Sequence, residues 1–313
     1  MITSTLAETA RKAAAGAAIS EAEARQLMAT SDIVSVGMIS SEARRVRVGD
    51  RVTFVRVAEI SVELAAAAAA SAPLPWPAAT SEIRITGTPR SINAAIAAVR
   101  AVALSRDGAS DTRTIPITAF SLADLWSLAN GDGPTLRELA QELRKAGVAA
   151  IADVPIDQFP NIDVAGAAVE IISAVGMFAP VASWQDPPPD PVASLMALHT
   201  LQERTRAFRA FAPLPRQQSA TQPSTGYEDV KIVAVARTVL HNLDHIQVDW
   251  TAHGPKLAQV ALLFGASDLD RVAPSDDAPL GHRRAPLEEV QRNIKSAFLA
   301  PIERDGRFEQ VAR

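Results

Sequence analysis

The chain alternates short runs rich in β-branched and apolar residues with longer amphipathic stretches. This alternation is typical of parallel strands that are joined by helical crossovers. Seven runs have the strand pattern, and an eighth candidate lies near Ser267–Val272. The seven predicted strands cover residues 51–60, 81–87, 114–120, 148–154, 177–183, 207–214 and 245–250.

Helix boundary signals support the segments between these runs. Ser20 and Glu23 have the spacing of a capping box, in which a hydroxyl and a carboxylate each accept a backbone N–H of the first helical turn. Further signals are a second pair at this spacing, Thr135 and Glu138, a candidate N-cap at Ser121, and a natural helix stop at Gly147.

The even strand–helix rhythm over this length favours a (β/α) TIM-type barrel, complete or partial, over a doubly wound sheet. We therefore expect an α/β fold in three parts. A helical extension covers residues 1–50, the barrel covers 51–270, and a C-terminal helical extension over 271–313 packs on the barrel. In such a barrel the chemistry belongs at the C-terminal ends of the strands.

Composition and charge exclude several classes of partner. The chain has 313 residues, 48% of them hydrophobic, and a net charge of −4 with its basic residues dispersed, so we expect no nucleic-acid partner. No stretch approaches the ~20 apolar residues that span a bilayer, and no secretory signal pattern opens the chain, so we expect no membrane partner and a cytoplasmic location. The short basic run at residues 44–47 is interpreted as a solvated helix end.

The sequence contains no cysteine. Disulfides, zinc–thiolate sites, cysteine nucleophiles and cysteine-ligated iron–sulfur clusters all need a thiol or thiolate sulfur. These four kinds of chemistry are therefore excluded for this chain.

Four segments together resemble one enzyme group. They are "DIVSVGMISSEARR" with "GDRVTFV" near the start, "LHTLQERTRAFRAFAPL" at 198–214, "HIQVDWTAHGPKLAQVALLFGASDLD" at 245–270, and "APIERDGRF" at 300–308. In this order they resemble the aminofutalosine synthase group of the radical SAM superfamily, which acts in menaquinone biosynthesis. The resemblance implies a barrel whose first strand leads into Cys-x3-Cys-x2-Cys, the ligands of a [4Fe–4S] cluster that binds SAM.

The chain departs from this group at the strand ends. The loop after the first strand reads "SVELAAAAAASAPLPWPAAT", with Glu63 as its one carboxylate. Where the group has a Gly-rich turn, this chain has "ADVPID", in which only the carboxylate of Asp157 is kept. Where the group has a Gly-Gly pair, this chain has Arg206-Ala207. The histidine after the fifth strand is lost in "PVASWQ", and the group's His-Pro is replaced around 215–218. We therefore expect no cofactor: no iron–sulfur cluster and no SAM.

A few side chains remain as candidates for chemistry. Asp157, Arg84 and Glu59 are candidate catalytic groups, and Glu59 and Arg84 are a candidate ion pair. Asp268 and Asp270 form a candidate acid/base pair, although a structural role bonded to nearby backbone is favoured. The candidate ligand-binding residues are Arg56, Arg84, Asp157, Trp184 and Asp268.

Trp76 and Trp184 are expected either to cover the barrel opening as a lid or to form an exposed patch that docks a partner. His241 and His245, four residues apart, have metal-ligand spacing, and Asp249 or His253 is a candidate third ligand. We expect no metal site there, because the helix is predicted to end between the two histidines.

These observations predict a pseudoenzyme. Such a barrel would bind a cysteine-bearing radical SAM homologue as an accessory subunit, or pair with a second copy of itself. The alternative is an enzyme with cluster-independent chemistry on a nucleoside or a carboxylated aromatic ligand, and a SAM-binding protein without redox activity is a third, less favoured interpretation.

Overall fold

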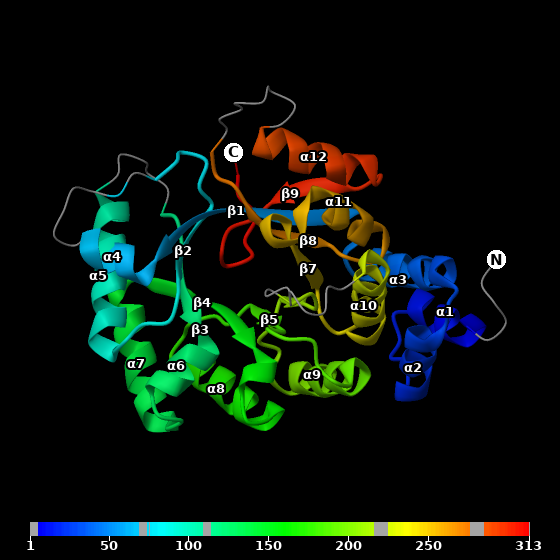
Figure 1. Ribbon diagram of the computed structural model, residues 1–313, viewed down its shortest axis with the longest axis horizontal. Coiled ribbons are helices and arrows are strands. Elements are labelled where there is room, and N and C mark those ends of the chain that lie inside the picture. Colours follow the sequence, from blue (N-terminus) through cyan, green and yellow to red (C-terminus); the bar gives the residue numbers. More distant parts are fainter. Residues whose placement is uncertain are drawn as a thin grey trace. The chain divides into compact units, whose positions relative to one another are not determined.

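The computed structural model describes residues 6–68, 74, 76–108, 114–215, 225–275 and 285–312. Within these residues nine strands form one sheet in the order β2-β3-β4-β5-β6-β7-β8-β1-β9, and β2 also pairs with β1 (Figure 1). The strands are β1 (Arg51–Ser61), β2 (Glu82–Thr86), β3 (Ile117–Ser121), β4 (Val148–Pro155), β5 (Val181–Ser183), β6 (Ala210–Ala212), β7 (His245–Asp249), β8 (Asp268–Val272) and β9 (Ala300–Glu303).

The pairing of β1 with both β8 and β2 closes the sheet on itself. Where the register between neighbours is defined, as for β1–β2 and β7–β8, the pairs are parallel. The expected (β/α) barrel is therefore confirmed. Its strands are connected by helices, the longest of which are α3 (Ile33–Val48), α5 (Ile92–Asp107), α7 (Gly133–Ala146), α8 (Ile162–Ala174), α9 (Pro191–Thr205), α10 (Gly226–Val239) and α11 (Trp250–Leu263).

The shorter helices lie at the ends of the chain and directly after strands. They are α1 (Ala7–Ala14), α2 (Glu21–Ala29), α4 (Val62–Ala68), α6 (Leu122–Leu128) and α12 (Pro286–Ser296). All eight predicted strands are present, although β5 and β6 have only three residues each. The ninth strand, β9, lies in the segment predicted as a helical extension. Its short, proline-containing sequence has no strand periodicity, and it is a strand because it pairs along β1.

The helix boundaries follow most of the sequence signals. The Ser20–Glu23 capping box is present, Ser121 caps α6, and Gly147 ends α7 with a φ of 115°. The predicted start at Thr135 is wrong. Asp132 is the N-cap of α7, and its carboxylate accepts the Thr135 N–H at 2.9 Å, because an aspartate one turn earlier satisfies the same orphan donors.

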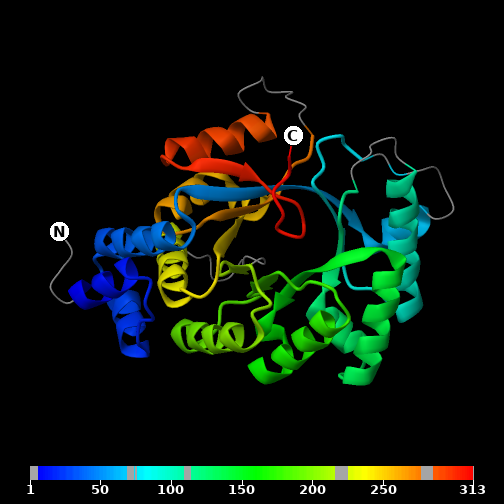
Figure 2. The ribbon, with the colours of Figure 1, turned by 180° about the vertical axis from the view of Figure 1, so that it is seen from behind.

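The chain divides into two compact units. Unit 1 comprises Met1–Phe54, Ser183–Asp270 and Val290–Ile302, and unit 2 comprises Val55–Ala182, Arg271–Glu289 and Glu303–Arg313. In unit 1, α2 and α3 pack against α10 (Figure 2). The Arg25 guanidinium lies 2.7 Å from the Asp190 carboxylate, which links α2 to the start of α9.

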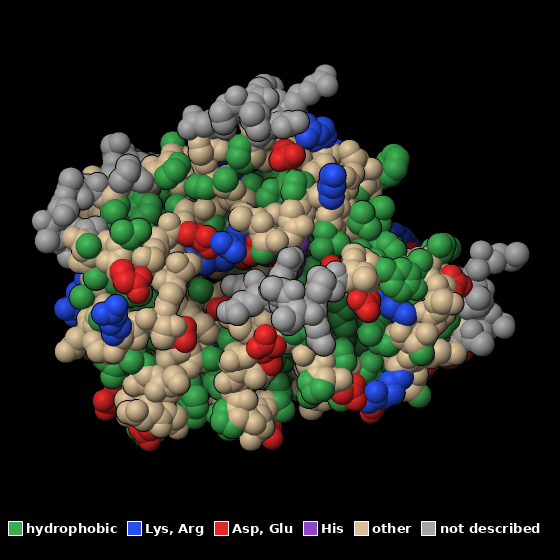
Figure 3. Space-filling view, in the orientation of Figure 1, with side chains coloured by type: hydrophobic (Ala, Val, Ile, Leu, Met, Phe, Trp, Pro, Cys, Tyr) green, Lys and Arg blue, Asp and Glu red, His purple; other side chains and the backbone are tan. Residues whose placement is uncertain are grey.

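In unit 2, α5, α7 and α8 pack in sequence order beside β2, β3 and β4. None of the helices in the described ranges combines the length and the apolarity that crossing a membrane requires. On the face seen in Figure 3, acidic and basic side chains are interspersed rather than separated by sign.

Candidate functional site

The C-terminal ends of β2, β3 and β4 bring together a set of acids in unit 2. Asp124 lies in the first turn of α6, directly after β3, and its carboxylate accepts a hydrogen bond of 3.1 Å from the Thr88 hydroxyl, which follows β2. Asp153 lies near the end of β4, in register with Ser121 at the end of β3, and is 5% exposed. This is the end of a barrel where catalytic groups belong.

Burial of the Asp124 carboxyl raises its pKa above the usual aspartate range. The hydrogen bond from Thr88 opposes this shift, and the negative charge of Asp153 adds to it. Two nearby carboxyl groups, one of which keeps its proton to a higher pH, can donate and accept protons. The sequence prediction missed Asp124, although an aspartate in the first helical turn after a strand is a visible signal.

Asp157, a predicted site residue, also lies at this end of unit 2. It sits in the 3-10 turn Ile156–Gln158 directly after β4 and accepts a hydrogen bond of 3.0 Å from the Gln158 side chain. Its position after the strand agrees with the sequence prediction, whereas its role stays a prediction.

Glu59 and Arg84 do not form the predicted ion pair. Their Cα atoms are register partners on β1 and β2, but the Glu59 carboxylate pairs with Arg271 at 2.9 Å. Arg84 Nε instead donates to Glu82 Oε1 at 2.7 Å. Glu82 and Arg84 are two residues apart on one strand and so lie on the same face of the sheet, which favours their pairing.

Arg56 belongs to a different part of unit 2. It is fully buried, and its Nε donates to Glu303 Oε1 at 3.2 Å. Glu303 also accepts a hydrogen bond from the Ser81 hydroxyl, just before β2 begins. The last residue of β9 therefore contacts Arg56, in the middle of β1, and Ser81, just before β2.

Gly306, three residues after Glu303, packs closely against the side chains of Glu82 and Thr118. A Cβ on Gly306 would lie 2.9 Å from both Glu82 Cγ and Thr118 Cγ2, so only glycine fits. The Thr118 hydroxyl donates to Glu82 at 2.6 Å, and the Arg304 guanidinium lies 3.7 Å from the Phe308 ring centre. We call residues 303–308, with the strand residues that they contact, the C-terminal clasp. Arg56 and Arg84, both predicted ligand-binding residues, are paired inside unit 2 with Glu303 and Glu82, respectively.

Asp268 of unit 1 is fully buried and bonded to side chains. It accepts hydrogen bonds from the Thr53 hydroxyl and, at 2.8 Å, from Gln247 Nε2. Asp270, two residues further along β8, is 1% exposed. The predicted strand is present, and these two partners of Asp268 are side chains of β1 and β7.

Trp184 is 1% exposed, so the exposed-patch interpretation is wrong for this residue. Its Nε1 donates to Ser194 at 3.1 Å, and its ring meets Phe211 edge-on at 5.0 Å, which makes it part of the unit 1 core. Trp76 in unit 2 is half-buried, and its Nε1 has no hydrogen-bond partner among the described residues.

The two candidate metal-binding histidines have different surroundings. Helix α10 ends at Val239, before both of them rather than between them. His241 stacks on His199 with ring centres 4.9 Å apart, whereas His245 Nδ1 lies 3.1 Å from the Ser267 hydroxyl. In the described ranges no three His, Asp or Glu residues form a group that could hold a metal ion.

The segment that follows β1 carries no cluster ligand. It continues directly into α4, whose sequence is VELAAAA, and Val62 and Ala65 are buried. Residues 69–73 and 75, which precede Trp76 in the segment between α4 and β2, lie outside the described residues. Because the chain has no thiolate, its residues do not fit a cysteine-ligated cluster.

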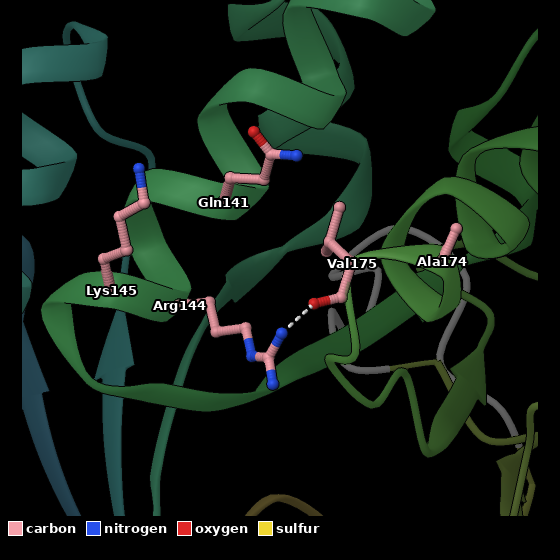
Figure 4. A pocket seen from close by; sticks show the side chains of 5 residues that line it. All are labelled: Gln141, Arg144, Lys145, Ala174 and Val175. Atoms are coloured by element: carbon pink, nitrogen blue, oxygen red, sulfur yellow. Dashed lines mark hydrogen bonds between the residues drawn. The ribbon is translucent and has the colours of Figure 1, made fainter.

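A surface pocket of about 590 Å³ lies beside α7 and the end of α8 in unit 2 (Figure 4). Its cationic side chains are already paired. The Arg144 guanidinium donates to the Val175 carbonyl at 2.6 Å, and Lys145 pairs with Glu142 at 2.7 Å. We therefore interpret this pocket as helix packing and not as a ligand site.

The closed parallel sheet defines the class of protein as a TIM-type (β/α) barrel of the kind seen in two solved structures. Methylornithine synthase (PylB) aligns with a TM-score of 0.64 and 13% identity over 94% of this chain and 97% of its own. The FeFe-hydrogenase maturase HydG from Carboxydothermus hydrogenoformans aligns with a TM-score of 0.64 and 13% identity over 95% of this chain and 79% of its own. At this identity the likeness shows the fold.

Residues 207–312 match the family model described as the CofH/MqnC C-terminal region. The resemblance read from residues 245–270 and 300–308 is thereby confirmed.

Two relatives show how far this similarity extends. The chain is 31% identical over 139 residues to the aminodeoxyfutalosine synthase of Streptomyces coelicolor, which covers 38% of this chain and 36% of that protein. It is 27% identical over 225 residues to the 5-amino-6-(D-ribitylamino)uracil–L-tyrosine 4-hydroxyphenyl transferase of Archaeoglobus fulgidus. This alignment covers 62% of this chain and 64% of that protein. The chain thus spans less than two thirds of the length of these relatives.

Proposed function

We propose that this chain is a catalytically degenerate relative of the aminofutalosine synthase group. In this proposal it acts as an accessory subunit that binds a cysteine-bearing radical SAM homologue, in menaquinone biosynthesis if the group's pathway is kept. The observation that carries the proposal is the absence of cysteine from a chain with a CofH/MqnC C-terminal region.

The local structure after β1 supports the loss of cluster chemistry. The resemblance places three cysteines in this segment, and here the chain forms the alanine-rich helix α4. Iron in a cubane cluster takes thiolate ligands, and neither alanine nor the single carboxylate of Glu63 replaces three of them. Chemistry that depends on such a cluster is therefore not expected from this chain alone.

The retained scaffold supports a binding role. Arg56 and Arg84 are paired inside unit 2, and the C-terminal clasp packs tightly on Glu82 and Thr118. Breaking a buried ion pair is costly, so these pairs stabilise the barrel independently of any cluster. A homologue with the same barrel is the partner that such a scaffold fits best, and a second copy of the chain is the competing partner.

The experiment is co-expression with a cysteine-bearing homologue from the same genome. We expect the two chains to co-elute as a stable complex whose mass equals their sum, and we expect the activity of the homologue to depend on this chain. A homologue whose three cluster cysteines are changed to alanine serves as the control, and it should still bind. Separate elution of the two chains at every salt concentration tested would contradict the accessory role.

Anaerobic reconstitution of this chain alone tests the other half of the proposal. We expect no stoichiometric iron and sulfide and no cubane EPR signal, because the ligand set lacks thiolates. A stoichiometric cluster in the isolated chain would overturn it.

A second candidate function is cluster-independent chemistry on a nucleoside or a carboxylated aromatic ligand. The observation that favours it is Asp124, whose raised pKa beside Asp153 suits proton transfer. Thermal-shift measurements with adenosine derivatives and chorismate-derived benzoates, on the native chain and on Asp124→Asn, test this candidate. A ligand response that is lost in the variant favours it over the accessory role, and no response from the native chain argues against it.

A further inference from the structure

A pocket of about 490 Å³ in unit 1 is lined by three arginines and lies beside the starts of β6 and β7. Arg47 comes from the last turn of α3, Arg206 from the end of α9, and Arg209 from the residue before β6 (Figure 1). Asp244, before β7, and Glu203 supply the negative charges of the lining.

The carboxylate of Asp244 orients two of the three arginines. Arg47 Nη2 lies 2.7 Å from Asp244 Oδ1, and Arg209 Nη1 lies 3.2 Å from Asp244 Oδ2. The side chains of Arg47 and Arg209 are 40% and 62% exposed, so their remaining N–H donors reach solvent. A guanidinium has five donors in a fixed fork, and one carboxylate oxygen uses only part of them.

Arg206 is held by its backbone rather than by its side chain. It has a φ of 49°, and its N–H donates to the Gln202 carbonyl at 2.8 Å, where α9 ends. It is exposed, and within the described residues no hydrogen bond or ion pair involves its guanidinium. The sequence places this arginine where the resembled group has glycine, which is the usual residue at this backbone conformation.

Arginines near helix ends often serve only to bind the last carbonyls, and here other arginines do so. Arg237 donates to the carbonyls of Leu243 and Asp244 at 2.8 and 3.1 Å after α10. Arg44 donates to the Gly49 carbonyl at 2.6 Å after α3. The turns after α10 and α3 are therefore held by Arg237 and Arg44 and not by the three pocket arginines.

The charges of the lining do not cancel. Three guanidinium groups face two carboxylates, and the Glu203 carboxylate already lies 3.7 Å from His199. The buried Arg237 adds a further positive charge behind Asp244. A ligand with two negative charges and several acceptor oxygens would match this excess and the forked donors.

We infer that this pocket of unit 1 binds the phosphate group of a small phosphate monoester. The three oxygens of a phosphate dianion match donors from Arg47, Arg206 and Arg209, because guanidinium forks suit tetrahedral oxyanions. This inference is independent of the proposed function.

The test is calorimetric titration of the full chain with inorganic phosphate and with glycerol 3-phosphate at pH 7.5, at constant ionic strength. We expect saturable binding with a dissociation constant of about 1 mM or tighter, weakened by added salt because the arginines are partly exposed. Glycerol 3-phosphate should bind at least as tightly as inorganic phosphate. No saturation with either ligand would overturn the inference.

Arg206→Gly is the sharpest variant, because glycine fits the backbone at this position and the fold is kept. We expect it, and separately Arg209→Ala, to weaken phosphate binding about tenfold or more through the loss of a charge-assisted hydrogen bond. Arg204→Ala, on the same helix but not in the pocket lining, is the matched control and should change affinity less than about twofold. Equal affinity in Arg206→Gly, Arg209→Ala and the control would place the anion elsewhere and overturn the inference.

Discussion

Two groups of charged side chains in unit 2 differ in how deeply they are buried. At the C-terminal clasp, the side chains of Arg56 and Glu303 are 0% and 10% exposed, and those of Arg84 and Glu82 are 6% and 2% exposed. In the other group, Glu59, although it is the register partner of Arg84, forms a pair with Arg271 that is about one-third exposed. Asp124 in this group has a hydroxyl as its hydrogen-bond donor and a second acid nearby.

This difference separates what stabilises the barrel from what could act on a ligand. Buried ion pairs are costly to break, because a lone buried charge loses both water and its partner. We therefore expect the buried pairs of the clasp to resist substitution more strongly than the exposed pair of Glu59 and Arg271.

The largest expected effect is at the C-terminal clasp. Glu303→Ala removes the carboxylate that accepts hydrogen bonds from the fully buried Arg56 and from Ser81, and we expect a loss of about 3–5 kcal/mol in the free energy of unfolding. Urea denaturation followed by circular dichroism measures it. A loss below about 1 kcal/mol, the range of an exposed pair, would show that the buried pair of Arg56 and Glu303 is no more stabilising than the exposed pair of Glu59 and Arg271.

Gly306→Ala tests the packing of the clasp without changing any charge. The new methyl group would lie 2.9 Å from Glu82 and Thr118, and we expect destabilisation of about 1–3 kcal/mol by overpacking. The same denaturation assay applies. Gly226→Ala, at a glycine with no atom within 4 Å of the added Cβ, is the matched control and should show no such steric cost.

Asp124→Asn sharpens the description of the strand ends through its pH dependence. Because the folded-state pKa of Asp124 is raised, the stability that its protonated form contributes is present below the unfolded pKa of about 3.9 and is lost as pH rises through the folded value. The native chain should therefore lose stability relative to Asp124→Asn as pH rises through this window, as measured by urea denaturation at several pH values.

Asp132→Asn is the control with the opposite sign. Hydrogen bonds from the Thr135 hydroxyl and N–H lower the pKa of Asp132, so its contribution is present above the unfolded pKa and lost as pH falls through the folded value. If the free energy of unfolding relative to the native chain changed with pH in the same direction for both variants, the opposite pKa shifts of Asp124 and Asp132 would be contradicted.

The smallest expected effect is at the exposed strand-end pair. Glu59→Gln should change the free energy of unfolding by at most about 1 kcal/mol, because solvent and salt screen its attraction to Arg271. The effect should shrink as salt is added in the denaturation assay. A loss as large as that of Glu303→Ala would give Glu59 a structural role that its exposure does not indicate.

The sequence by itself determined the barrel strands, several helix ends and the exclusion of thiolate chemistry. Alternation of apolar runs predicted all eight barrel strands, Ser20, Ser121 and Gly147 marked helix ends, and the lack of cysteine excluded thiolate chemistry. These features are local, because strand periodicity, capping and the presence of a donor atom depend on residues close in the chain or on composition alone.

Only the tertiary structure decided which charges pair. Arg56 binds Glu303, 247 residues away, and Glu59 binds Arg271, 212 residues away. No local pattern predicts such pairs, since they depend on strand register and on where a terminal segment such as β9 returns to the sheet. For the same reason the sequence named Arg84 and Trp184 as site residues, and their burial became visible only when the strands and helices were packed together.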